Sequence, residues 1–310
     1  MQQKKIKVAI VQAAPVYYKL YQSLSKAKKL VTEAVKRGAQ LVAFGETWLP
    51  GYPAWLDMCT EAALWNHDET KELFATLKEN SVVVPGIETA ELAQLAKKLK
   101  IVIAIGVNER VEKGRGRGTL FNSLLLFNSN GELVNHHRKL IPTYTERLVW
   151  GQGDARGLKA ATTTAGTVGG SICWEHWMPL TRQHLHNEAE QIHISMWPGV
   201  HEMHQVASRH YAFEGRCFVL ACGLIMYKKD MPRGFKVAEK YARTKSDFLI
   251  NGGSAIIGPD GSYIAGPVFD KETILVAEID TRQIAKEQMT LDTAGHYYRD
   301  DVFNFSLKRT

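Results

Sequence analysis

The chain has 310 residues, of which 45% are hydrophobic and 23% are charged. This composition matches that of an ordinary soluble globular protein, so extended disorder is excluded. The formal net charge of +7 raises nucleic acid as a partner, but the basic residues are scattered and no basic run is interleaved with aromatic residues. The densest basic stretch, residues 113–118, is predicted to be a solvated hairpin tip.

The sequence indicates a cytoplasmic protein that does not span a membrane. Its basic start runs directly into a strand-like segment, without the apolar region and cleavage site of a secretory signal. No long uninterrupted apolar stretch appears elsewhere. The spacing of the cysteines fits neither a paired zinc site nor a dense disulfide framework, so they are expected to be free thiols. They are Cys59, Cys173, Cys217 and Cys222.

Strand and helix signals alternate through the first half of the chain. Short apolar runs indicate buried strands, and apolar residues at helical spacing indicate amphipathic helices. In chain order, the signals predict a strand at 8–11, a helix at 20–35, a strand at 41–44, a long excursion with an acidic helix at 49–85, a helix around 92–99, a strand at 101–105 and a hairpin that turns at 128–131. Long excursions in compact domains tend to shape sites.

The second half repeats this alternation. In chain order, the signals predict a strand that ends at 172, a helix at 179–190, a strand at 193–196, a helix at 201–216, a strand at 219–221, a hairpin that turns at 258–261 and a closing strand at 274–279. Helices that separate buried strands, combined with hairpins, argue for mixed sheets covered by helices. The similar halves suggest two sheets packed face to face. Because no linker divides the chain, we expect a single domain over residues 1–310, with a short C-terminal tail from about residue 296.

Three polar residues stand just past apolar segments, where open α/β sheets usually place their ligand crevice. They are Glu46, Lys139 and Cys173. Each alone has an ordinary structural explanation, as a carboxylate bound to local backbone, a surface lysine or a small core cysteine. Together they could supply a base, an electrostatic stabiliser and a nucleophile, because a thiol needs a base or a positive neighbour to react near neutral pH.

Four longer segments carry a resemblance to a known family. They are GETWLPGYP at residues 45–53, HRKLIPT at 137–143, ERLVWGQGD at 146–154 and CWEHWMPL at 173–180. In this order and separation they resemble the signature blocks of the nitrilase family, and the resemblance extends from Val8 to about Val302. The chain departs from the family pattern at Gly45, where proline is common, and at Ala155, where glycine is common.

The resemblance implies an α/β fold, namely a four-layer αββα sandwich of two mixed β-sheets that pairs across a dimer interface into an αββααββα unit. It also implies a catalytic site without a metal or other cofactor. On this chain the roles fall on Glu46 as general base, Lys139 as electrostatic stabiliser and Cys173 as nucleophile. Glu146 matches the family's second glutamate, which orients the lysine or handles a proton. The implied partners are a small-molecule nitrile and further copies of the chain.

Within the wider family, the tryptophan after Cys173 and the Pro142-Thr143 pair after Lys139 favour the true nitrilases. These would hydrolyse an organic nitrile to a carboxylic acid and ammonia through a covalent cysteine thioimidate and a thioester. An amidase or carbamoylase would use the same triad on an amide. A non-catalytic binding protein of the same fold would be expected to lose at least one triad residue.

Aromatic and polar residues in or beside the motif loops are predicted to bind the substrate. They are Tyr52, Trp55, Thr143, Tyr144, Trp174, His176, Trp177 and Trp197. Such a pocket suits arylaliphatic or larger aliphatic nitriles, although aromatic residues also dominate protein cores. The nearest histidine pairs lack the spaced cysteine or carboxylate partners of a recognisable metal site, so no metal is expected. These pairs are His201 with His204 and His184 with His186.

Overall fold

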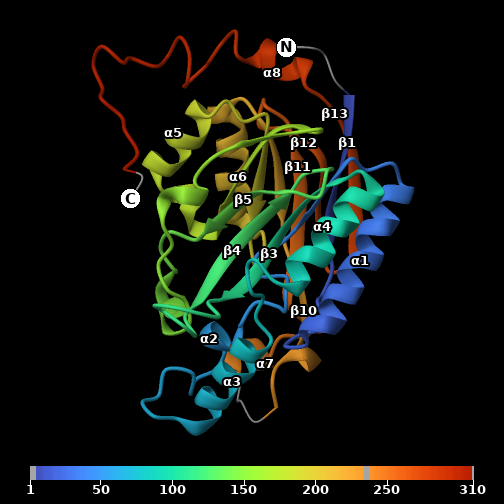
Figure 1. The fold of residues 1–310 in the computed structure, drawn as a ribbon, viewed down its shortest axis with the longest axis vertical. Coiled ribbons are helices and arrows are strands. Elements are labelled where there is room, and N and C mark those ends of the chain that lie inside the picture. Colours follow the sequence, from blue (N-terminus) through green and yellow to red (C-terminus); the bar gives the residue numbers. More distant parts are fainter. Residues whose placement is uncertain (1–4, 234–236, 309–310) are drawn as a thin grey trace.

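Two β-sheets pack face to face between layers of helices in the computed structural model, which describes residues 5–233 and 237–308 (Figure 1). The first sheet has six strands in the order β13-β1-β2-β3-β4-β5. These strands are β1 (Lys5–Gln12), β2 (Leu41–Phe44), β3 (Val102–Arg110), β4 (Leu120–Phe127), β5 (Leu133–Arg138) and β13 (Thr273–Asp280). Strands β1, β2 and β3 run parallel, whereas β13, β4 and β5 pair antiparallel with their neighbours, so the sheet is mixed.

The second sheet has seven strands and is mixed in the same way. Its order is β10-β11-β9-β8-β7-β6, with β12 paired to β11. The strands are β6 (Ala161–Thr163), β7 (Gly166–Ile172), β8 (Ile192–Met196), β9 (Phe218–Cys222), β10 (Ile225–Tyr227), β11 (Phe248–Ile257) and β12 (Tyr263–Phe269). Strands β7, β8 and β9 are parallel, and β6, β10 and β12 pair antiparallel at the margins.

Among the described residues, helices lie over the outer faces of the sheets or beyond their ends. They are α1 (Leu20–Lys36), α2 (Trp55–Met58), α3 (Asp68–Glu79), α4 (Ile87–Leu99), α5 (Pro179–Asn187), α6 (Glu202–Gly215), α7 (Glu239–Ala242) and α8 (Arg282–Glu287). Short 3₁₀ turns are η1 (Tyr144–Leu148), η2 (Ala155–Gly157), η3 (Cys173–Trp177) and η4 (Lys228–Asp230). Figure 1 shows α1 and α4 on one side of the sandwich, and α5 and α6 on the other.

Successive side chains along the strands of the first sheet point to opposite faces, and this divides the core into two parts. Val42 and Phe44 point outward with neighbouring strand residues and pack with α1 and α4. Leu41 and Ala43 point inward and belong to one apolar cluster with residues of β7, β8 and β9 of the second sheet. Both faces of the central strands are therefore apolar, as expected for parallel strands covered on both sides. The prediction of a helix-covered sandwich of two mixed sheets is confirmed.

Most expected elements form close to their predicted bounds, and one helix is shorter. The helix expected over residues 179–190 ends at Asn187, because Ala189 adopts a left-handed φ of 54° and Glu190 turns inward to bind His193. The basic stretch at residues 113–118 lies in the connection between the antiparallel strands β3 and β4, and its residues 113–117 are exposed. Among the described residues, no helix is long and apolar enough to cross a membrane.

Candidate active site

Three strand ends bring the predicted triad together. Glu46 follows β2, Lys139 follows β5 and Cys173 follows β7. The Lys139 Nζ donates to Glu46 Oε1 over 3.1 Å and to Glu146 Oε2 over 2.7 Å. The Cys173 sulfur and one carboxylate oxygen from each glutamate lie within 4.8 Å of one another. All four side chains are buried, so a thiol, two carboxyl groups and an ammonium group share one small volume.

The backbone around Cys173 is held by the carboxylate of Glu175. The Ile172 N–H donates to Glu175 Oε2 over 2.7 Å, and the Leu140 N–H donates to Glu175 Oε1 over 2.8 Å. One carboxylate thus ties the residue before Cys173 to the residue after Lys139. Cys173 itself has a φ of 54°, a left-handed conformation that costs about 1–3 kcal/mol in a non-glycine residue and persists only where its surroundings enforce it.

Glu46 is positioned by the first sheet. The Asn122 side-chain amide donates to Glu46 Oε1 over 2.6 Å from the middle of β4. On β3, a Cβ added to Gly106 would lie 2.4 Å from the Gly45 carbonyl oxygen and 2.5 Å from the Thr47 nitrogen. Only glycine therefore lets β3 pass this close to the backbone on both sides of Glu46.

Gly45 is also closely packed from the second half of the chain. A Cβ added there would lie 2.8 Å from Leu224 Cδ2 and 3.1 Å from the Trp197 carbonyl oxygen. The same Trp197 oxygen accepts the Glu46 N–H over 3.3 Å. The departure from proline at this position therefore coincides with a tight contact between the two sheets.

Burial and the charges within the cluster determine the pKa values of its groups. Burial raises the pKa of Glu46 to about 7, and the carboxylate of Glu146 adds to this effect, while Lys139 opposes it. Burial also raises the pKa of the Cys173 thiol well above its usual range, with Glu46 adding to the effect. Burial alone would lower the pKa of Lys139, but the negative groups around it raise that pKa, so the ammonium form persists. At rest the site therefore holds a protonated thiol beside a carboxyl group that titrates near neutral pH.

A metal could in principle be held by the sulfur and the two carboxylates, since they have suitable ligand atoms. Lys139, however, already donates to both carboxylates from within the cluster. The chain thus supplies its own cation at the position where a metal would balance the charge.

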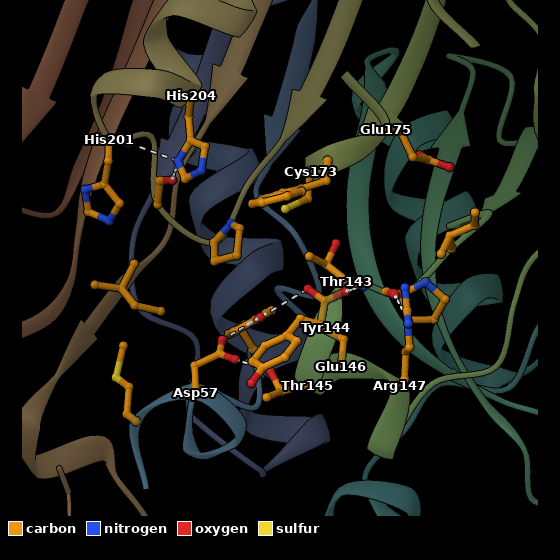
Figure 2. A pocket seen from close by; sticks show the side chains of 18 of the residues that line it. Asp57, Thr143, Tyr144, Thr145, Glu146, Arg147, Cys173, Glu175, His201 and His204 are labelled. Carbon is orange, nitrogen blue, oxygen red and sulfur yellow. Dashed lines mark hydrogen bonds between the residues drawn. The ribbon is translucent and has the colours of Figure 1, made fainter. Parts of the chain in front are cut away.

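A cavity of about 940 Å³ opens onto the cluster. Of the residues predicted to bind substrate, the cavity is lined by Tyr52, Thr143, Tyr144, Trp174 and Trp177. Trp55, His176 and Trp197 are instead buried outside that lining. Figure 2 shows His201 and His204 across the cavity from Glu146 and Tyr144.

Several cavity residues come from segments that carry no motif. Asp57 and Met58 belong to α2, in the excursion expected to shape a site. The Asp57 carboxylate accepts from the Tyr52 hydroxyl over 3.1 Å, and that hydroxyl also lies 3.1 Å from Glu146 Oε1. The remaining unpredicted lining residues are Ile141, Pro142, Thr145, Arg147, Glu175, Met178, Pro198, Gly199, His201, His204, Tyr241, Leu249 and Ile250.

Comparison with known proteins gives the chain its family. Residues 7–286 match the family model described as carbon-nitrogen hydrolase. The chain belongs to the carbon-nitrogen hydrolase family. The family resemblance of the four sequence segments is thereby confirmed, and the buried thiol, carboxyl and ammonium groups lie within the matched region.

Curated relatives of this carbon-nitrogen hydrolase bear nitrilase names. "Nitrilase 2" from an unknown prokaryotic organism is 39% identical over 99% of this chain and 93% of its own length. An "Aliphatic nitrilase" of Sinorhizobium fredii is 36% identical over 96% of this chain and 94% of its own. An "Arylacetonitrilase" of Trametes versicolor is 34% identical over 98% of this chain and 97% of its own.

Solved structures share the fold of this carbon-nitrogen hydrolase at low sequence identity. A carbon-nitrogen hydrolase from Helicobacter pylori superposes with a TM-score of 0.71 at 19% identity, over 98% of this chain and all of the other. Saccharomyces cerevisiae Nit3, a member of branch 10 of the nitrilase superfamily, gives 0.70 at 19% identity, over 95% and 97% of the two chains. These likenesses support the sandwich fold.

Proposed function

We propose that this hydrolase converts an organic nitrile to a carboxylic acid and ammonia, with Cys173 as the nucleophile. The observation that carries the proposal is the buried cluster in which the Cys173 sulfur lies within 4.8 Å of oxygens of both Glu46 and Glu146, while Lys139 donates to both carboxylates. The nitrilase names of relatives that align over nearly the whole chain support the choice of a nitrile.

The first half-reaction joins the substrate to the enzyme. The Cys173 thiol loses its proton to Glu46 as the sulfur attacks the nitrile carbon, and Glu46 passes that proton to the nitrile nitrogen. One carbon–sulfur bond forms and one nitrile π-bond breaks, which leaves a covalent thioimidate. Lys139 stabilises the negative charge that develops on nitrogen.

The second half-reaction releases both products. Water adds to the thioimidate to give a tetrahedral carbon bearing sulfur, oxygen and nitrogen. Loss of ammonia leaves a thioester, and a second water activated by Glu46 releases the carboxylic acid and restores the thiol. Collapse of the tetrahedral species with loss of sulfur would release an amide instead, so some amide is expected as a by-product.

Glu46 is suited to a role in which one group accepts a proton and later returns it. Its pKa of about 7 means that both its protonated and its ionised forms are populated near neutral pH. One oxygen, Oε1, binds Asn122 and Lys139, whereas Oε2 has no hydrogen-bond partner among the described residues. That free oxygen is the one we assign to proton transfer.

The cavity lining suits a substrate with an apolar or aromatic body. Trp174, Trp177 and Ile250 supply apolar surface, and the volume of about 940 Å³ exceeds the needs of a very small nitrile. We therefore propose arylaliphatic or larger aliphatic nitriles as the substrate class.

The deciding experiment incubates the protein with phenylacetonitrile, an aliphatic dinitrile, cyanide and the matching amides, and measures ammonia, acid and amide together. We expect acid and ammonia from the nitriles at rates well above those from the amides. Faster hydrolysis of the amides would make the protein an amidase or carbamoylase. No product from any nitrile or amide would favour a binding protein.

We further propose that the chain pairs with a second copy of itself. The neighbouring helices α5 and α6, which lie on the outer side of the second sheet, carry exposed apolar side chains. They are Leu180, Met203, Val206 and Phe213, with 71%, 59%, 51% and 46% of their surface exposed. A group of large apolar side chains on one outer face is typical of an interface between protein chains.

A further inference from the structure

A buried polar chain lies directly behind Cys173 and takes no part in the steps above. The His176 Nδ1 lies 2.6 Å from the Cys173 carbonyl oxygen, and the His176 Nε2 lies 3.0 Å from His193 Nε2. The His193 Nδ1 in turn lies 2.9 Å from Glu190 Oε2. All of these side chains are buried, so each polar contact is made without competition from water.

The chemistry of the partners assigns the protons in this chain. The Cys173 carbonyl oxygen can only accept, so His176 Nδ1 carries a hydrogen. Burial lowers the pKa of His176 to about 3, so the ring is neutral and its Nε2 is an acceptor. The Ser195 hydroxyl, 2.7 Å from this nitrogen, is then a donor to it, and His193 Nε2 faces the same nitrogen over 3.0 Å.

Glu190 fixes the end of this polar chain that lies farthest from Cys173. Burial alone would raise its pKa, but the facing His193 and His186 rings lower that pKa to about 2, so Glu190 is a carboxylate that accepts from His193. The rings are also fixed by stacking. His176 stacks on Trp197 with 4.7 Å between ring centroids, and His193 stacks on Tyr211 with 3.7 Å. His176 can therefore present its Nδ1 hydrogen in one direction only.

The near end of the chain is the peptide group that follows the nucleophile. The Cys173 carbonyl and the Trp174 N–H belong to this one planar unit, so holding the oxygen also sets the direction of the N–H. A backbone hydrogen bond from Trp174 lowers the pKa of the Cys173 thiol, against the larger effect of burial, so the direction of this N–H bears on the reactivity of the sulfur. Because Cys173 has a left-handed φ of 54°, the orientation of this peptide needs support from its surroundings.

We propose that His176 and His193, anchored by Glu190, are positioning residues that aim the Trp174 N–H at the Cys173 sulfur and so increase the reactivity of the thiol. Their importance for turnover rests on the proposed function, but the reactivity of the thiol can be measured without any nitrile. The proposal also gives His176 and Trp197, which lie outside the cavity lining, a task other than contact with substrate.

The test measures the rate at which iodoacetamide alkylates Cys173 near neutral pH, followed by peptide mass analysis. We expect His176→Leu to slow alkylation about tenfold, the effect of one hydrogen bond worth about 1.4 kcal/mol. His176→Asn places an amide N–H near the position of Nδ1, and should keep the rate within about twofold of the wild type. His193→Leu should slow the reaction about threefold, and His193→Gln, which keeps a hydrogen-bonding amide near Nε2, should reverse most of that loss.

His184→Leu is the matched control. It removes a bond of the same kind, between His184 Nε2 and the Leu158 carbonyl oxygen at 2.9 Å, from another buried histidine. Its alkylation rate should equal that of the wild type. Folded His176→Leu protein that alkylates at the wild-type rate would overturn the proposal, and if that variant does not fold, wild-type alkylation of His193→Leu would do so.

Nitrile turnover by the same variants separates this inference from the proposed function. In His176→Leu, kcat should fall in proportion to the alkylation rate while KM stays within about threefold, because the cavity lining is unchanged. A wild-type protein that hydrolyses no nitrile but shows the predicted alkylation pattern would refute the proposed function and leave the positioning role supported.

Discussion

The cluster around Cys173 contains two carboxyl groups for one ammonium group. Lys139 donates to both Glu46 and Glu146, and all of these groups are buried. Ionising both glutamates therefore leaves one negative charge without a matching cation in a medium of low polarity. Burial, together with this imbalance, raises the pKa of Glu46 to about 7, and so equips that residue for proton transfer at the pH where the reaction would run.

The rate should depend on pH through Glu46. As a general base it works in its ionised form, so kcat/KM should fall about tenfold for each pH unit below about 7 and level off above it. The measurement is a pH profile of kcat/KM on the best nitrile. A profile that stays flat down to the ordinary carboxyl pKa of 4.5 would contradict this role.

Glu46→Gln should lose activity and, near neutral pH, gain stability relative to the wild type. Because folding raises the pKa of Glu46 from 4.5 to about 7, the folded protein binds this proton more tightly than the unfolded chain does. The free energy of unfolding of the wild type should therefore fall, relative to the variant, by about 3 kcal/mol as pH rises from about 4.5 to about 7. Urea denaturation of both proteins across this range measures the difference. An unchanged difference would show that Glu46 titrates normally.

The sequence predicts the triad because each member directly follows a strand or strand-like segment. Glu46, Lys139 and Cys173 stand where chain direction alone indicates a shared edge. Asn122 and His193 carry no such signal. Each lies inside a strand, and its contact with the site depends on how distant strands pair across the sheet, which local periodicity does not contain.

Among the elements, those marked by a continuous apolar run or by a clear helical period are predictable, and those without either signal are not. The strand at Leu41–Phe44 and the end of β7 at Ile172 match their predictions, because continuous apolar runs mark buried strands. Strands β6 and β10 and helix α7 have three or four residues each, which is too short for a period to appear. The contact of β3 with the turn after β2 also cannot be predicted from the sequence of either segment alone.

That contact predicts the effect of Gly106→Ala. The new methyl group would meet the backbone at Gly45 and Thr47, so either strand β3 or Glu46 must move. We expect the free energy of unfolding to fall by about 1–3 kcal/mol and kcat to fall at least about tenfold, because a small displacement of a catalytic group is costly.

Gly114→Ala is the control for this substitution. Gly114 has a φ of 80° and open space around it, at the tip of the β3–β4 hairpin. Alanine there strains the backbone without touching the site, so stability should fall while kcat stays unchanged. Equal kcat values for Gly106→Ala and wild type would show that Glu46 does not depend on this packing.

In the molecule as a whole, the two sheets pack face to face, and a layer of helices covers the outer side of each (Figure 1). The cluster around Cys173 draws on both sheets, since Glu46 and Lys139 come from the first and Cys173 from the second. The sandwich must therefore form before the site exists, and any loosening between the sheets separates Cys173 from Glu46. The outer face of α5 and α6 remains available for a second copy.

The proposed pairing predicts the behaviour of the protein in solution. Sedimentation equilibrium at micromolar concentration should give at least twice the mass of one chain. Phe213→Glu or Val206→Glu places a charge among the exposed apolar side chains of α6, and should shift the mass toward that of one chain. A wild-type protein that sediments as a single chain would refute the pairing.

Whether Cys173 is the nucleophile is decided by comparing the wild type with Cys173→Ala in the release of ammonia from phenylacetonitrile or the best nitrile of the panel. Cys173 sits at a strand end with its sulfur facing two carboxylates, so its replacement should leave the circular dichroism spectrum unchanged. We expect the variant to lose at least about 10⁴-fold in kcat, since nothing else in the cluster can form the covalent intermediate. A folded Cys173→Ala protein that releases ammonia at a rate near that of the wild type would contradict the account.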